Sequence, residues 1–215
     1  MKAAVILAGS GVFDGSEIHE ATLTLLALDL AGVEYQCMAP NIEQNANVNH
    51  LNNDPLSSPR NVMEEAARIA RGEIVDIATV SSDDYDCLLI PGGFGAALNL
   101  CNFAQKGPDC EVNPDVEKTI LSFYQDRKPI GAMCIAPALV AKVLGKEDVL
   151  VTIGNDTGTA DAIEACGAIH QNCEVDEIIV DEANRVVTTP AYMLASGPAQ
   201  AWSGIEKLVE KVINF

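Results

Sequence analysis

Short apolar runs alternate along most of the chain with longer segments in which apolar residues recur every three or four positions. Ala3–Ala8 is a continuous apolar run followed by glycine, as is typical of a strand covered on both faces. The next segment, from about Ser16 to Leu30, has helical spacing, with Ser16 as the expected N-cap and Gly32 beyond its end. The same alternation predicts further strands at about 34–39, 73–77, 87–90, 130–133, 150–153 and 170–175, and further helices at about 58–71, 114–125, 135–144, 157–166 and 199–213.

This order of elements predicts an α/β fold with a doubly wound, mostly parallel sheet and helices on both faces. The chain has 215 residues, 48% of them hydrophobic, which is enough for one well-buried domain and marginal for two. We therefore expect a single domain over residues 1–215. Near its end, Ile178–Asp181 and Arg185–Thr189 predict an antiparallel hairpin.

Two segments do not follow the alternation. Asn41–Ser58 is polar and rich in asparagine, which predicts an irregular excursion with at most a short strand at Val48–Leu51. Asn99–Val112 has no clear period, and we expect it to cover one end of the sheet.

Charge and cysteine usage narrow the class of protein. The chain carries 31 acidic and 13 basic residues, a net charge of −18, so we expect no binding to nucleic acid or to anionic membranes. No apolar run approaches transmembrane length, and the first one is too short for a signal peptide. Seven cysteines without a CxxC pair are typical of reduced thiols, which predicts a cytoplasmic protein.

The segment PIGAMCIAP places Cys134 between an apolar strand and a helix. A cysteine at such a junction fits a nucleophile elbow, where a sharp turn lifts the side chain above the sheet. Unpaired N–H groups at the helix start would stabilise a thiolate and ease ionisation of the thiol. A buried structural cysteine explains the segment equally well.

Two other strand ends are expected at the same edge of the sheet as Cys134, because parallel strands present their carboxyl ends together. Glu17 follows the first strand, and as a structural residue it would only cap a helix. Gly92 and Gly93 follow the strand at 87–90, and their N–H groups suit an anion, although a tight turn would look the same. Together the three sites supply a nucleophile, a carboxyl acid/base and an oxyanion hole.

The histidines do not indicate a metal. His19, His50 and His170 are not spaced for zinc, either with one another or with cysteine, so we expect no metal ion. His19 and Glu20 are candidates to line the pocket, with surface exposure or core packing as the alternative for both. Tyr192 is a further candidate, with packing as its alternative, and so is Phe94, next to the glycine pair.

The elbow AMCIAP, the turn PGGFG and the early DGSEIHE resemble the ThiJ/PfpI superfamily, which is related to the class I glutamine amidotransferase domain. GSGVFDGSEIHE, RNVMEEAARIARGEI, PGGFGAALNLCNFA and VVTTPAYMLA are similar to its ElbB group, whose members are associated with isoprenoid biosynthesis. The resemblance runs nearly end to end. It implies a flavodoxin-like fold and a homodimer.

The resemblance also implies roles for individual residues. Cys134 would be the nucleophile, Glu17 its acid partner, and the backbone at Gly92, Gly93 and Ile135 the source of N–H donors. The implied activity is a cofactor-independent glyoxalase that converts glyoxal to glycolate or methylglyoxal to lactate, so the partner is a small aldehyde or dicarbonyl substrate.

Histidines that related hydrolases use are missing from this chain. Ile135 stands where PfpI-type peptidases carry histidine, Thr152–Asp156 contains none, and there is no His-x-Glu triplet of the amidotransferase type. We therefore expect Cys134 to add to an aldehyde carbon while Glu17 moves a proton between adjacent carbons. The alternative is a non-catalytic redox sensor or regulatory subunit that uses the same thiol.

Overall fold

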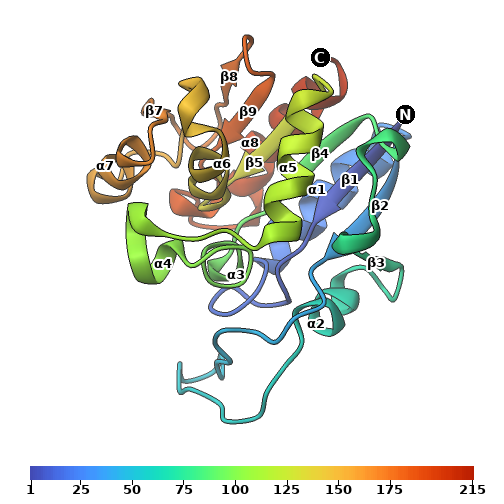
Figure 1. Ribbon diagram of the computed structural model, residues 1–215, viewed down its shortest axis with the longest axis vertical. Coiled ribbons are helices and arrows are strands. Elements are labelled where there is room, and N and C mark those ends of the chain that lie inside the picture. Colours follow the sequence, from blue (N-terminus) through green and yellow to red (C-terminus); the bar gives the residue numbers. More distant parts are fainter.

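The computed structural model describes every residue from Met1 to Phe215, and its centre is one seven-stranded sheet (Figure 1). In spatial order the strands are β3 (Ile74–Asp76), β2 (Glu34–Ala39), β1 (Lys2–Ile6), β4 (Cys87–Ile90), β5 (Ile130–Met133), β9 (Val186–Thr189) and β8 (Ile179–Asp181). Every neighbouring pair is parallel except β8 and β9, which form the predicted antiparallel hairpin. The predicted flavodoxin-like, mostly parallel fold is confirmed.

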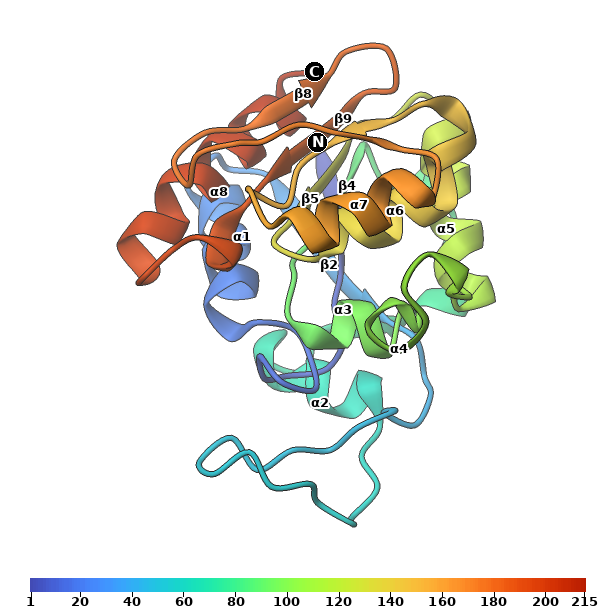
Figure 2. The same cartoon turned by 90° about the vertical axis from the view of Figure 1, so that its left-hand side faces the viewer.

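Helices cover both faces of this sheet, as the view in Figure 2 shows. One face packs against α1 (Ile18–Leu30), α2 (Val62–Ile69) and α8 (Pro198–Ile213), and the other against α3 (Phe94–Leu98), α4 (Phe103–Lys106), α5 (Pro114–Gln125), α6 (Ala136–Leu144) and α7 (Thr157–Ala165). None of these helices combines the length and the apolar character that crossing a bilayer requires.

Strand β1 shows why the central strands are apolar throughout. Ala4 and Ile6 belong to the core under α5 and α6, whereas Ala3 and Val5 belong to the core under α1 and α8. All four residues are fully buried. A strand with a core on each side has no solvent face, so its sequence does not alternate.

The strands predicted at 150–153 and 170–175 are shorter than expected and lie outside the main sheet. They form β6 (Leu150–Val151) and β7 (Ile169–His170), which pair with each other. The N–H groups of Leu150 and Thr152 donate to the side chains of Asp181 and Thr188, at 2.8 and 2.9 Å. The segment around β6 is thus attached to the β8–β9 hairpin through side chains. Because it forms no backbone ladder with the hairpin, β6 does not join the main sheet and stays short.

Two other boundaries differ from the prediction. Helix α2 begins at Val62 because the Asn61 side chain accepts hydrogen bonds from two N–H groups of its first turn, so Ser58 lies outside the helix. The segment 99–112 contains α4 and a 3₁₀ turn at Gly107–Asp109, and a single bridge between Cys101 and Val112 closes it.

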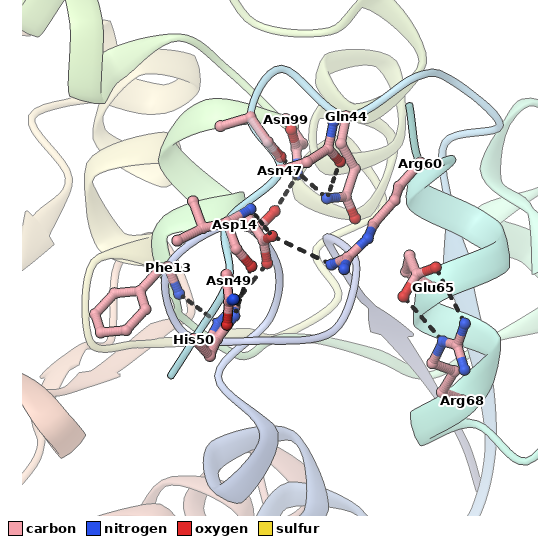
Figure 3. A network of polar contacts seen from close by, with 12 residues as sticks. Phe13, Asp14, Gln44, Asn47, Asn49, His50, Arg60, Glu65, Arg68 and Asn99 are labelled. Carbon is pink, nitrogen blue, oxygen red and sulfur yellow. Dashed lines mark hydrogen bonds and ion pairs between the residues drawn. The ribbon is translucent and has the colours of Figure 1, made fainter. Parts of the chain in front are cut away.

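A buried aspartate holds the excursion at residues 41–61 against the loop before α1 (Figure 3). Asp14 Oδ2 accepts the N–H of Val48 at 2.7 Å and lies 3.5 Å from Nη1 of Arg60. Nε2 of His50 accepts the N–H of Phe13 at 3.2 Å. These contacts join the excursion to the loop that leads into α1. Within the excursion, the expected short strand is reduced to one bridge between Val48 and Pro55.

Candidate active site

Cys134 occupies a strained turn between β5 and α6. Its φ is +60°, a left-handed conformation that costs a residue with a side chain roughly 1–2 kcal/mol. The Cys134 N–H donates to the Thr189 carbonyl on β9 at 3.0 Å, and Pro137 fits the first turn of α6. The sheet and the helix therefore hold a backbone shape that cysteine would not adopt alone. This is the sharp strand-to-helix turn that the sequence predicts.

The carboxyl group beside the Cys134 thiol belongs to Glu20, on the first turn of α1. Glu20 Oε2 accepts the Gly92 N–H at 2.9 Å, and Oε1 accepts the Tyr192 N–H at 3.0 Å. The carboxyl group also lies beside the thiol of Cys134, and each of the two groups affects the pKa of the other. Glu20 thus joins α1, the turn after β4 and the turn after β9 at the nucleophile.

Burial raises the pKa of Glu20 to about 7, although the two backbone donors favour its charged form. The nearby Glu17 carboxylate contributes to the increase. A carboxyl group with a pKa near neutrality both accepts and returns a proton under ordinary conditions, which is what general acid–base catalysis requires.

Glu17, the predicted acid partner, caps α1 instead. Its Oε2 accepts the N–H of Glu20 at 2.7 Å, the contact of an N-cap residue. Ser16, the expected cap, is used elsewhere because its Oγ accepts the N–H of Ala8 at 2.8 Å. Glu17 still lines the cavity in front of Cys134, but the carboxyl that contacts the sulfur is that of Glu20. The role predicted for Glu17 stays a prediction, and the structure adds Glu20, three residues further along, as the carboxyl group beside the sulfur.

The backbone donors are also distributed differently from the prediction. The N–H groups of Gly93 and Ile135 are the backbone donors near the sulfur of Cys134, and they lower the pKa of its thiol. Gly92, the third predicted donor, gives its N–H to Glu20. Gly92 is needed for space, because a Cβ on it would lie 2.4 Å from the Cβ of Cys134.

The thiol does not ionise easily in this structure, contrary to the expectation from the helix start. Burial raises the pKa of Cys134 well above its usual range, and the adjacent Glu20 carboxylate raises it further. The N–H groups of Gly93 and Ile135 act in the opposite direction without reversing the shift. The sulfur therefore becomes nucleophilic as its proton moves to Glu20, so the two residues act as a unit.

A cavity of about 500 Å³ opens in front of Cys134. Of the predicted pocket residues, Phe94 and Tyr192 line it, whereas His19 stands outside and binds the Tyr192 hydroxyl through Nδ1 at 2.7 Å. Most of the lining is apolar, with two carboxylates at its edge. The lining residues are Val12, Glu17, Gly93, Phe94, Ala97, Phe103, Ala104, Cys134, Ile135, Asp156, Gly158, Thr159, Ala162, Tyr192 and Met193.

No histidine reaches the sulfur. His50 binds the Phe13 N–H, and His170 Nε2 accepts the Ile153 N–H at 3.2 Å. With His19 held by Tyr192, all three imidazoles have partners elsewhere. Nor do three or more His, Cys, Asp or Glu side chains gather closely enough to hold a metal ion.

Sequence reasoning gave Glu20 at most a place in the lining of the site, and it missed Asp156. Glu20 shares the buried face of α1 with Ala21, Thr24 and Leu28. A carboxylate on the core-facing side of a helix was the signal that could have identified it. Asp156 caps α7 by accepting the Thr159 N–H at 2.8 Å, and it carried no signal beyond that of an ordinary cap.

No family model matches the chain, but named relatives do. The human glutamine amidotransferase-like class 1 domain-containing protein 3, mitochondrial, is 46% identical over 224 aligned positions, which cover 100% of this chain and 83% of the human protein. The rat ES1 protein homolog, mitochondrial, is 43% identical and covers 100% of this chain and 84% of its own. The word mitochondrial in these names contradicts the cytoplasmic location expected for this chain. The expectation was wrong because unpaired cysteines indicate a reducing compartment without identifying which one.

Solved structures give the same picture. An isoprenoid biosynthesis protein with an amidotransferase-like domain from Ehrlichia chaffeensis is 36% identical, has a TM-score of 0.94, and covers 100% of this chain and 98% of its own. Schizosaccharomyces pombe DJ-1 is 17% identical, with a TM-score of 0.59 and coverage of 99% of this chain and 92% of its own, so it shares the fold.

Proposed function

The chain belongs to the family of glutamine amidotransferase-like class 1 domain proteins, and we propose that it uses Cys134 and Glu20 to carry out a cofactor-independent glyoxalase reaction. The observation that supports this most is the buried Glu20 carboxyl against the thiol, with its pKa near 7. The reaction needs a nucleophile and one group that moves protons between adjacent carbons.

The first step forms a carbon–sulfur bond. The Glu20 carboxylate accepts the Cys134 proton while the sulfur attacks the aldehyde carbon of the dicarbonyl substrate. Glu20 then returns that proton to the new alkoxide oxygen, which gives a hemithioacetal and restores the carboxylate. The N–H groups of Gly93 and Ile135 stabilise the negative charge that develops beside the sulfur.

The second step moves hydrogen between the two carbons. Glu20 removes the proton from the former aldehyde carbon, which gives an enediolate. The hydroxyl proton of the hemithioacetal passes to the neighbouring oxygen, and Glu20 delivers its own proton to the neighbouring carbon. The product is a thioester of Cys134 that carries a hydroxyl group on the adjacent carbon. Water then cleaves the thioester, which releases the hydroxy acid and regenerates the thiol. No electrons leave the system, and the net reaction consumes one dicarbonyl and one water.

Glutamine hydrolysis and redox sensing fit the site less well. Amide hydrolysis by cysteine needs an acid that protonates the leaving amine, usually histidine, and each of the three histidines has a partner elsewhere. A peroxide sensor needs an exposed thiol of low pKa, whereas Cys134 is 7% exposed and its pKa is raised.

Turnover of glyoxal and methylglyoxal by purified protein tests the proposal. Wild type should form glycolate and lactate, also after treatment with EDTA. Cys134→Ser should be inactive, and Glu20→Gln should lose turnover by about 10²–10⁴-fold, the usual contribution of general acid–base catalysis. Glu17→Gln, at the helix cap, is the matched control and should retain most activity. Activity that survives in Glu20→Gln but disappears in Glu17→Gln would reverse the assignment.

A further inference from the structure

We propose that the cavity beside Cys134 selects neutral aldehydes that carry an apolar chain or ring, in preference to glyoxal and methylglyoxal. For the chemical step this rests on the proposed function, but the selectivity follows from the cavity itself. Three properties of the cavity support it: its size, its lining and its charge.

The cavity is larger than the small dicarbonyls require. Its volume of about 500 Å³ falls within the range of roughly 300–1,000 Å³ that holds drug-sized ligands. Glyoxal consists of little more than the reacting carbons, and methylglyoxal adds one methyl group. Either substrate would leave most of the space in front of the sulfur unused.

The polar and apolar parts of the cavity differ in what they can bind. At the reacting end, the N–H groups of Gly93 and Ile135 lie near the sulfur, and the start of α7 contributes the polar residues Asp156 and Thr159 to the lining. The remaining wall is supplied by apolar side chains of short helices and of α7, among them Phe103, Ala104 and Ala162. Such a wall gains free energy only from apolar substrate atoms that it removes from water.

The charges around the cavity argue against anionic substrates. Its ionisable lining side chains besides Cys134 and Tyr192 are Glu17 and Asp156, and it contains no lysine, arginine or histidine. A carboxylate or phosphate on the substrate would therefore meet like charge without a counter-ion. The whole chain, at −18, adds to this repulsion.

The test measures how well aldehydes protect Cys134 from iodoacetamide at pH 8, followed by peptide mapping. Reversible hemithioacetal formation protects the thiol and needs no turnover, so this test stays valid if the glyoxalase proposal fails. Straight-chain aldehydes from propanal to octanal should protect at concentrations that fall about fourfold per added methylene, the ratio that ~0.8 kcal/mol gives. Succinic semialdehyde, which carries a carboxylate, should protect poorly.

Substitutions of residues that line the apolar part of the cavity test whether the dependence of protection on chain length arises there. Ala162→Phe, on α7, should flatten the dependence on chain length by occupying the apolar end, and Ala104→Phe, on α4, gives the same test if the first variant fails to fold. Ala165→Phe is the matched control, since it lies exposed on the same helix but outside the cavity. Protection that is independent of chain length in wild type, or equal for the anionic aldehyde, would overturn the inference.

Discussion

Glu20 Oε2 and Cys134 Sγ approach each other over the α-carbon of Gly92. A Cβ at that position would lie 2.7 Å from the carboxylate oxygen and 2.9 Å from the sulfur. The absence of a side chain at Gly92 is therefore what allows the Glu20 carboxyl group and the Cys134 thiol to meet, and the Gly92 N–H holds the carboxyl group in place.

Gly92→Ala should separate the pair. The added methyl group meets the Cys134 side chain at 2.4 Å, so the turn must shift, at a cost of about 1–3 kcal/mol in the free energy of unfolding. Turnover of methylglyoxal should be lost even where the protein is folded. Gly197→Ala, with no atom within 4 Å of its added Cβ, is the control and should keep turnover. Wild-type turnover in Gly92→Ala would show that the spacing is not critical.

The free energy of unfolding should fall as the pH rises from 5 to 8. The pKa of Glu20 is raised from 4.5 to about 7 in the folded protein, so its protonated form favours folding below pH 4.5 and this stabilisation is lost as the pH rises through 7. The loss amounts to about 3 kcal/mol from this group. Urea titrations of wild type and Glu20→Gln isolate it, because the other groups cancel in the difference. Parallel stability curves would contradict the raised pKa.

The rate of reaction with methylglyoxal should increase with pH and level off above about 7. The reactive form carries an ionised Glu20, so kcat/KM should follow the titration of that group. Glu17→Gln should keep the same profile with a lower midpoint, because the Glu17 carboxylate raises the pKa of Glu20. A profile that stays flat between pH 5 and 8 would exclude Glu20 as the base.

Asp14→Ala should loosen the excursion at residues 41–61. The substitution removes a charged acceptor from the N–H of Val48 and from Arg60 (Figure 3), which should lower the free energy of unfolding by about 2 kcal/mol. Limited proteolysis should cut the excursion faster in this variant. Asp54→Ala, at an exposed position of the same segment, should behave as wild type. Equal cutting of the two variants would mean that Asp14 does not hold the excursion.

We expect a homodimer in solution, formed through the outer surface of α1. Leu26 and Leu30 are 41% and 69% exposed, one turn apart on that helix. Light scattering should therefore give twice the 22.8 kDa of one chain, and Leu30→Lys should give a single chain. Leu51→Lys, at a leucine 92% exposed in the excursion, is the control and should leave the mass unchanged. A wild-type mass of 22.8 kDa would remove the expectation.

The sheet could be predicted because its signals are local. The unbroken apolar run at Ala3–Ala8 is enough to predict a buried strand, and the few residues around Cys134 are enough to predict the strand-to-helix junction. The segments at 150–153 and 170–175 also have apolar character, but their partners are side chains of a hairpin far along the chain. Contacts of that kind leave no periodic pattern, so the lengths of β6 and β7 could not be predicted.

The carboxyl group beside the sulfur could not be predicted for a related reason. Position relative to a strand end fits both Glu17 and Glu20, and the resemblance to known proteins pointed to Glu17. What separates them is the direction in which each side chain leaves the helix start: Glu17 turns back to the free N–H of Glu20, whereas Glu20 faces the core. That depends on whether the helix begins at Ser16 or at Ile18, and boundaries are the least predictable feature of an element.

The contacts of Glu20 also have a consequence for the order of events during synthesis. Its two oxygens bind the N–H groups of Gly92 and of Tyr192, and Tyr192 leaves the ribosome well after both Gly92 and Cys134. A nascent chain that has already made its cysteine still lacks the second anchor of its base. Until β9 and the turn after it have docked, the Glu20 carboxyl group has only one of its two backbone partners, so a chain that stops before Tyr192 contains Cys134 and Glu20 without the contact that completes the site.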